Sequence, residues 1–186
     1  MTLGIVFDRI RWEEKEIIEK ARLRGIELNI VDVKQEFLDI HDKNLEKKFG
    51  TTTLIRCISY FRSLSVSAFL ESKGIKTINE SKVFQICGNK LLTSLALVKA
   101  NIPTPRTKVS FSLEGALEAA ESLGYPSVLK PLIGSWGRMV VPLKDREVAK
   151  AMFEMREEMD NPLDKIYYIQ EFVDRPPRDI RCIVVG

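Results

Sequence analysis

The sequence has very little histidine: His41 is the single one among 186 residues. The sequence therefore disfavours three classes of site that depend on histidine: Ser-His-Asp hydrolysis, Cys-His nucleophilic catalysis and multi-histidine metal sites. His41 lies in a polar stretch and is predicted to be a surface loop residue.

Cysteine is also scarce. Cys57, Cys87 and Cys182 are far apart in the sequence and lie in apolar runs. An odd number of isolated cysteines disfavours a disulfide framework or a zinc site. We expect three buried free thiols, which indicates a reducing, cytoplasmic location.

Long hydrophobic runs are missing. No stretch approaches the roughly 18 apolar residues of a membrane span, and the first apolar run, Leu3 to Phe7, is followed at once by Asp8 and Arg9. We therefore expect neither a membrane segment nor an export signal.

A strong charge of one sign is missing too. Lys and Arg number 29 against 26 Asp and Glu, a net charge of +3, and the two signs are interleaved. Without an aromatic and basic platform, the sequence disfavours a nucleic-acid binder. The slight positive balance suits an acidic partner only weakly.

What remains is an ordinary globular composition, with 45% hydrophobic and 30% charged residues. A chain of this length forms one or two small domains and buries roughly 70% of its surface. Such a chain builds a core without metals or disulfides.

The hydrophobic pattern predicts an α/β fold in two parts. Residues 1–80 repeat a strand, helix, strand order and are predicted to form a small open-sheet domain. Residues 81–104 are predicted to be a helical connection, and residues 105–186 a second domain. The expected elements of residues 1–104 are strands at 3–7, 26–33, 53–58 and 75–78, and helices at 12–24 and 90–99. A further helix is expected with Phe61, Leu64 and Ala68 on one face and Gly74 as its cap, and a short helical piece is expected to end near Gly88.

The second part, residues 105–186, is predicted to contain both strands and capped helices. Ser112 and Asp145 are predicted N-caps, and Gly124 a C-cap. The helix after Asp145 is expected to bury Val148, Ala151, Met152 and Met155. The expected strands are 107–110, 127–130, 138–143, 166–172 and 179–185.

The strongest chemical signal is a lysine at a strand end followed by a glycine loop. Lys130 ends the apolar segment Ser127 to Lys130, and Gly134 and Gly137 follow it closely. Glycines let backbone amides approach phosphate oxygens, and lysine supplies a point charge for a polyphosphate. The alternative is a two-glycine hairpin beside a surface lysine, because the loop matches neither common phosphate-binding fingerprint.

Two further segments agree with a nucleotide site. Tyr168 to Val173 leaves a strand in a form suited to an adenine hinge, where backbone groups bind the base between apolar walls. The alternative is an ordinary strand end with a solvated glutamate. Lys90 opens a helix, where its charge opposes the helix dipole unless an anion is near; the alternative is an exposed helix lysine.

Together these features resemble the ATP-grasp family of carboxylate-amine ligases. The resemblance covers essentially the whole chain and is closest to the branch that adds amino acids to ribosomal protein tails or to an amino-group carrier protein. It implies an N-terminal pre-ATP-grasp domain followed by the first part of an ATP-grasp domain. The segments that carry it are Asp8 to Arg11, Arg56 to Ser59, Cys87 to Lys90, Ile133 to Arg138 and Arg178 to Arg181.

The resemblance implies roles for particular residues. Lys90 and Lys130 would bind the ATP phosphates, and a flexible loop would cover them. Trp136 in that loop packs on the nucleotide or anchors the loop, two alternatives that the sequence leaves open. The cover would comprise Gly134, Ser135, Trp136, Gly137 and Arg138; the adenine hinge Gln170, Glu171, Phe172 and Val173; and the ribose and phosphate side Asp179 and Arg181.

Substrate contacts are expected elsewhere. Arg9, Ser59 and Arg62 lie near predicted strand ends or a helix start, where an open sheet places its ligands. They are candidates for gripping an anionic carrier tail, although Ser59 could instead cap a helix.

The resemblance also implies the reaction. ATP would activate a carboxylate as an acyl phosphate, which an amine then attacks to form an amide. The carboxylate would be the terminal glutamate of a small acidic carrier protein, and the amine that of α-aminoadipate or glutamate, in lysine or arginine biosynthesis. Members of this branch commonly form homo-oligomers.

Magnesium is implied as well, but no metal ligand is assigned within the chain. In the family the acidic and asparagine ligands come later, so they are expected beyond residue 186. We therefore expect these residues alone to bind nucleotide weakly and not to turn over. The alternative function is an inactive nucleotide-binding or partner-binding module of the same fold.

Overall fold

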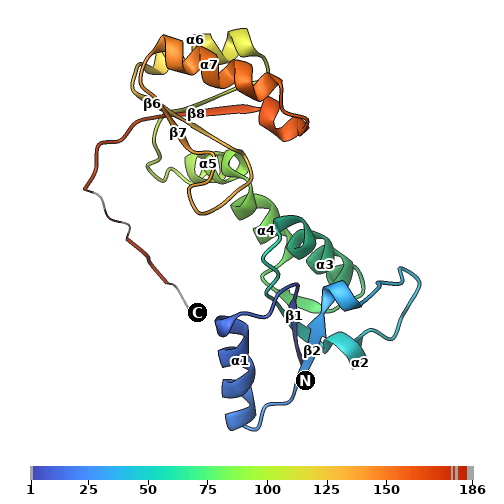
Figure 1. Cartoon of the computed structure of the whole chain (residues 1–186). Coiled ribbons are helices and arrows are strands. Elements are labelled where there is room, and N and C mark those ends of the chain that lie inside the picture. Colours follow the sequence, from blue (N-terminus) through green and yellow to red (C-terminus); the bar gives the residue numbers. More distant parts are fainter. Residues whose placement is uncertain (1, 177, 179, 184–186) are drawn as a thin grey trace. The chain divides into compact units, whose positions relative to one another are not determined.

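The computed structural model describes residues 2–176, 178 and 180–183. The chain forms two compact units, Met1–Leu92 and Thr93–Gly186 (Figure 1). The division falls within α5 (Lys90–Lys99). Each unit has its own sheet and its own core.

The first unit is built on a parallel sheet with the strand order β2-β1-β3-β4. Parallel neighbouring strands require long crossover connections, which are usually helical. Its strands are β1 (Leu3–Phe7), β2 (Leu28–Asp32), β3 (Thr52–Ile55) and β4 (Lys76–Ile78), and its helices α1 (Trp12–Leu23), α2 (Glu46–Phe49), α3 (Tyr60–Ser72) and α4 (Ser81–Gly88).

The register separates this sheet into two faces. Val6 of β1 is level with Val31 and Ile55, and these side chains form a core with the fully buried Phe49 of α2 and Leu70 of α3. Successive strand residues point to opposite faces. The α2 and α3 side therefore holds the packed core of the unit.

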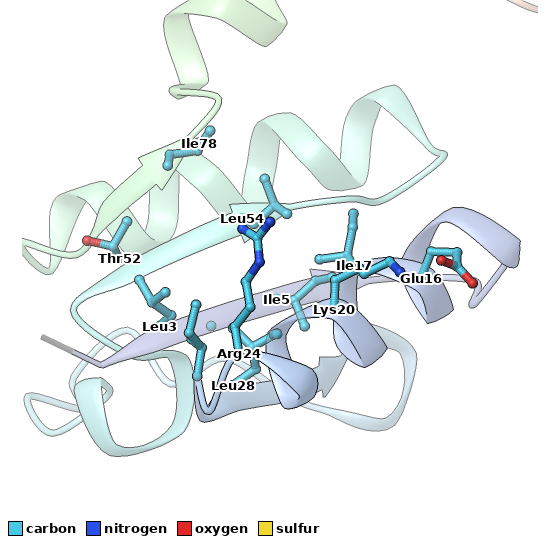
Figure 2. A pocket seen from close by; sticks show the side chains of 13 residues that line it. Leu3, Ile5, Glu16, Ile17, Lys20, Arg24, Leu28, Thr52, Leu54 and Ile78 are labelled. Atoms are coloured by element: carbon cyan, nitrogen blue, oxygen red, sulfur yellow. The ribbon is translucent and has the colours of Figure 1, made fainter. Parts of the chain in front are cut away.

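The other face of the sheet borders α1. Leu3 and Ile5 lie there, level with Leu28 and Leu54 on the neighbouring strands. Between this face and α1 is a hollow of about 450 Å³. Figure 2 shows the Arg24 side chain extending into it. The lining is mainly aliphatic, so the hollow offers apolar contact rather than catalytic groups.

The second unit has an antiparallel sheet with the order β5-β8-β6-β7, with α6 and α7 packed on one face (Figure 1). Leu129, Ile169 and Phe153 are fully buried between sheet and helices. Its elements are β5 (Thr107–Ser110), α6 (Leu113–Leu123), β6 (Ser127–Lys130), β7 (Val141–Leu143), α7 (Arg146–Glu157) and β8 (Tyr167–Glu171).

The predicted helix caps are confirmed. The Ser112 hydroxyl accepts a hydrogen bond from the Gly115 amide, and the Asp145 carboxylate accepts one from the Val148 amide. Each satisfies a first-turn amide that has no partner within its helix. Gly124 follows α6 with φ of 87°, a conformation that favours glycine.

The predicted inner face of α7 is wrong by one residue. Ala149, Phe153 and Arg156 are the buried positions, whereas Met155 is 45% exposed. Counting only apolar residues favoured the methionine, because a charged Arg156 was not expected in the core. Ala151 is also exposed, and Val148 and Met152 are partly buried.

Three smaller expectations also need correction. No strand is formed by described residues 180–183, because a strand requires a paired neighbour; the rest of the predicted strand 179–185 lies outside the described residues. The strand predicted at 138–143 begins only at Val141. The cysteines are free as expected, but Cys87 and Cys182 are exposed and only Cys57 is partly buried.

Candidate functional site

The open face of the second sheet carries Lys130. Strand alternation turns Leu129 toward the helices and Lys130 to the opposite face, level with Tyr168 of β8. The Lys130 Nζ donates a hydrogen bond to the Gln170 Oε1 at 2.5 Å. Burial lowers the pKa of Lys130, and within the described part of the chain no carboxylate forms an ion pair with it. A partly desolvated ammonium held by a neutral amide is suited to receive an anion.

A buried hydrogen-bond network holds Gln170. Its Nε2 donates to the Thr107 Oγ1 at 2.9 Å and to the Tyr168 hydroxyl at 3.2 Å. Tyr168 in turn lies 2.7 Å from the Ser94 hydroxyl. These contacts orient the Gln170 amide so that its oxygen faces Lys130. Thr107, Tyr168 and Ser94 were not among the predicted site residues, although Tyr168 opens the predicted hinge segment.

A groove of about 520 Å³ lies beside this network. Its polar lining comes from Lys130, Gln170, Glu171 and Arg175, and the remaining lining is apolar. Pockets for small ligands commonly combine apolar walls with a few placed polar groups. The apolar lining comprises Pro105, Val128, Val140, Pro142, Phe172 and Val173.

The predicted hinge follows β8 along the groove. Phe172 and Val173 are half exposed, and within the described residues their backbone groups form no hydrogen bond. The Glu171 carboxylate instead accepts hydrogen bonds from the Arg106 amide at 2.8 Å and Nε at 2.7 Å. The Arg106 bond lowers the pKa of Glu171. Glu171 is thus engaged by Arg106, whereas the backbone groups of Phe172 and Val173 make no hydrogen bond within the described residues; that they bind an adenine edge stays a prediction.

The glycine loop is exposed to solvent, and its backbone contacts include Arg138 N to Ser135 O at 3.4 Å and Val140 N to Gly137 O at 3.3 Å. Gly137 has φ of 67° and Trp136 φ of 64°. The Trp136 side chain is 87% exposed, so it does not anchor the loop to the protein. Gly134, Ser135 and Arg138 are exposed as well.

The remaining predicted nucleotide contacts are spread along the chain. Lys90 begins α5, where the Asn89 Oδ1 caps the helix by accepting from the Leu91 amide at 2.9 Å. Lys90 belongs to the first unit and Lys130 to the second, so their joint grip on one triphosphate stays a prediction. Arg181 is exposed in irregular structure, and Asp179 lies outside the described residues.

In the first unit, the loops after β1 and β3 meet at the carboxyl end of the sheet. Asp8 is 4% exposed and accepts from the Ile58 amide at 2.8 Å, the Ser59 amide at 3.2 Å and the Arg62 Nη1 at 3.1 Å. Burial raises the pKa of Asp8, but these three hydrogen bonds outweigh it and leave the pKa below its ordinary value. The Ser59 hydroxyl accepts from the Arg62 amide at 3.4 Å, so it caps α3. Arg9 is exposed.

Glu14 is the second buried carboxylate of these loops, and its side chain is 0% exposed. It accepts from the Arg11 Nε and Nη2 at 3.0 and 2.8 Å, and from the Arg56 Nε at 3.0 Å. The hydrogen bond from Arg11 and then that from Arg56 lower its pKa to about 2 against the opposing effect of burial. The sequence indicated this pair only indirectly, because both arginines lie in segments that carried the family resemblance.

The low pKa of Glu14 predicts an acid dependence of stability. A carboxyl with an ordinary pKa of 4.5 and a folded value of about 2 stabilises the fold above pH 4.5, and this contribution is lost as pH falls through the folded value. Glu14→Gln is expected to lower the free energy of unfolding at pH 7, with a difference from wild type that shrinks below pH 4.5. Urea unfolding from pH 7 to pH 3 measures this.

Glu19→Gln is the matched control for that series. Glu19 also pairs with an arginine three residues away on α1, Arg22, but this pair is exposed to solvent. Exposed pairs contribute little to stability. A Glu14→Gln variant that follows the wild-type pH profile would contradict the assignment of the acid dependence to Glu14.

Comparison with known families agrees with the two-unit fold. Residues 3–86 match the LysX preATP-grasp domain, and residues 87–186 match the RimK-like ATP-grasp domain. The fold and the lysine-bearing groove thus define an ATP-grasp protein with its N-terminal companion domain. More particularly, the chain belongs to the RimK-like ATP-grasp family. The family resemblance seen in the sequence is confirmed.

Curated relatives match over the full chain. The chain is 39% identical to the glutamate–LysW ligase ArgX of Sulfolobus acidocaldarius, covering 100% of the chain and 65% of the relative. It is also 39% identical to the alpha-aminoadipate–LysW ligase LysX of Sulfurisphaera tokodaii, with 100% and 66% covered. The chain therefore spans about two thirds of the length of these relatives.

Solved structures show the same architecture. The ATP-grasp RimK domain protein from Sphaerobacter thermophilus superposes with a TM-score of 0.79 at 26% identity, covering 94% of this chain and 64% of that one. D-alanine–D-alanine ligase from Bacillus anthracis complexed with ATP gives a TM-score of 0.65 at 20% identity, with 94% and 57% covered. At that identity the second likeness shows the fold alone.

The described residues fit ATP better than they fit a metal. The groove offers an ammonium without an acidic partner and apolar walls beside free hinge backbone, which match a phosphate and a base. Across residues 2–176, 178 and 180–183, no cluster of three or more histidine, cysteine or acidic side chains could hold a metal ion. Within the part of the chain that the structure describes, no helix is both long enough and apolar enough to cross a bilayer.

Proposed function

We propose that the protein is an ATP-dependent ligase that joins the terminal glutamate of a small acidic carrier protein to the amine of α-aminoadipate or glutamate. The observation that carries the proposal is Lys130, half-buried over an apolar groove and hydrogen-bonded to an uncharged amide. The names of relatives that are 39% identical support the substrate class. The pathway would be lysine or arginine biosynthesis.

Each part of the groove has a task in this chemistry. Lys130 binds phosphate oxygens, because its ammonium is poorly hydrated and has no carboxylate to neutralise it. The backbone at Phe172 and Val173 binds the adenine edge between apolar walls. Gly134 to Arg138 covers the phosphates, since the segment is exposed and has positive φ values at Gly134, Trp136 and Gly137, as in loops whose backbone amides bind anions. Lys90, Asp179 and Arg181 are further candidate nucleotide contacts.

Gln170 acts on ATP through Lys130. Its side chain is already engaged by Lys130 and Thr107, so its amide orients the ammonium rather than holding adenine. The bound ATP supplies the phosphoryl group that activates the carboxylate. Catalysis then consists of positioning and charge neutralisation, as phosphoryl transfer generally requires. Magnesium would assist at ligands outside the described residues.

The test is ADP release with carrier protein and amino acid present together. In a polypeptide that carries the expected later metal-ligand segment as well as residues 1–186, we expect release to require both substrates and the carrier to gain the mass of one amino-acid residue, measured by mass spectrometry. Parallel reactions with α-aminoadipate and with glutamate identify the amine. ATP binding without ADP release or carrier modification would instead support a nucleotide-binding module without catalysis.

A further inference from the structure

The carboxyl end of the first sheet gathers four arginines from the loops after β1 and β3 and from the first turn of α3. Arg9 and Arg11 follow β1, and Arg56 and Arg62 follow β3. The two strands are parallel neighbours, so their ends open at the same edge, where open α/β sheets bind ligands. Three carboxylates accompany these arginines, that of Asp8 in the loop after β1 and those of Glu13 and Glu14 in the first turn of α1, so the four arginines outnumber them.

The acids are hidden while the cations are accessible. The Glu14 side chain is 0% exposed, whereas those of Arg11 and Arg56 are 32% and 33% exposed. Asp8 is 3% exposed and its partner Arg62 is 54% exposed. Glu13 is the accessible acid of the group, 3.7 Å from the Arg11 Nη1. Buried carboxylates thus hold guanidinium groups that face solvent.

Arginine donors remain unused after these contacts. Arg56 uses its Nε and Nη2 on Glu14, and Arg62 uses its Nη1 on Asp8. In the part of the chain that the structure describes, the Arg56 Nη1 and the Arg62 Nε and Nη2 have no partner, and neither has the Arg9 guanidinium. Guanidinium groups with free N–H pairs are suited to carboxylates, which they bind by paired hydrogen bonds.

We propose that Arg9, Arg56 and Arg62 form a carboxylate-binding site, with Glu14 and Asp8 as the positioning residues that orient Arg56 and Arg62. The proposal rests on the proposed function and extends it, because both of that reaction's organic substrates carry carboxylates. Arg11 serves the site indirectly, since its bidentate contact fixes Glu14. The Ser59 hydroxyl caps α3.

The test is calorimetric titration of the protein with two probes in the presence of ATP. One is free L-glutamate, and the other is a short peptide that ends in glutamate, which stands for a carrier tail. Arg56→Gln and Arg62→Gln are expected to weaken binding of the preferred probe by about tenfold each, as loss of a charge-assisted hydrogen bond predicts. Arg22→Gln, on the exposed face of α1, is the matched control and should bind like wild type.

Glu14→Gln separates positioning from direct contact. It leaves Arg56 in place but removes the charge that orients it, so we expect several-fold weaker probe binding and unchanged ATP affinity in a protein that remains folded by circular dichroism. If that variant does not fold, the two surface arginine variants still decide. Wild-type affinity in both Arg56→Gln and Arg62→Gln, or no binding of either probe at millimolar concentration, would overturn the proposal.

The probe that binds identifies the source of the carboxylate. Preference for the peptide assigns the site to the carrier tail, and preference for free glutamate assigns it to the amino-acid substrate. ATP affinity is measured in the same titrations. If wild type binds ATP but neither probe, the result speaks against this site alone, whereas absent ATP binding to wild type speaks against the ligase proposal.

Discussion

Lys130→Ala is expected to weaken ATP binding by roughly 10- to 100-fold, because a hydrogen bond to a charged group contributes about 1.5–3 kcal/mol. Lys130 and Arg175 are the cations that line the groove, and the Lys130 ammonium is hydrogen-bonded to a neutral amide. Removing it also leaves the Gln170 Oε1 without this donor. Calorimetric titration with ATP measures the affinity, and thermal unfolding without ATP shows that the fold is intact.

Lys108→Ala is the matched control for this experiment. Lys108 lies on β5 of the same sheet, is exposed, and contacts the Ser122 hydroxyl at the surface. It has no place in the groove, so we expect wild-type ATP affinity. Equal affinities for wild type and Lys130→Ala would show that the phosphates bind elsewhere.

Gly4→Ala is expected to destabilise the first unit by about 3 kcal/mol or more, since forced overpacking costs about 1–3 kcal/mol when side chains can yield and more when backbone must move. A Cβ at Gly4 would lie 1.9 Å from the Phe49 carbonyl oxygen and 2.8 Å from its carbon. That oxygen already accepts from the Thr53 Oγ1 at 2.7 Å. Urea unfolding followed by circular dichroism measures the loss.

Gly74→Ala distinguishes the steric cost of an added Cβ from the cost of the backbone conformation. Gly74 has φ of 80°, and a Cβ there would meet nothing within 4 Å. Its cost is therefore the left-handed conformation alone, about 1–2 kcal/mol. A Gly4→Ala variant no less stable than Gly74→Ala would show that the Phe49 carbonyl does not lie against Gly4.

The local signals of the second unit were strong enough to place its elements. The predicted bounds of β5 and β6, Thr107–Ser110 and Ser127–Lys130, match the structure. Ser112 and Asp145 each precede an apolar run, and a side chain that caps a helix acts within three residues. Capping and strand alternation are local effects, so local sequence predicts them.

Burial of charge could not be predicted in the same way. Arg156 lies on the buried face of α7 and is 1% exposed. Within the described structure, its Nη1 is buried without a hydrogen-bond partner. Burial lowers the pKa of Arg156. The sequence pattern favours Met155 for that position because methionine is apolar, and only the packing of Phe153 against Tyr167 sets the rotation of the helix.

In the candidate site, too, local features could be predicted from the sequence and long-range contacts could not. Lys130 and the hinge could be found because a lysine at a strand end, a glycine loop and a second strand follow in order along the chain. The role of Gln170 could not, because Thr107 lies 63 positions away and Ser94 lies 74 positions from Tyr168. Such contacts depend on which strands pair.

The sequence by itself determined that this is an α/β protein in which a strand-end lysine is followed by a glycine loop, because alternation, capping and loop composition act over a few residues. The tertiary structure decided which charges are buried and which partners orient them. Pairing β5 with β8 brings Gln170 to Thr107, and the loops after β1 and β3 enclose Asp8 and Glu14. Desolvation and partner geometry arise only when distant segments pack together.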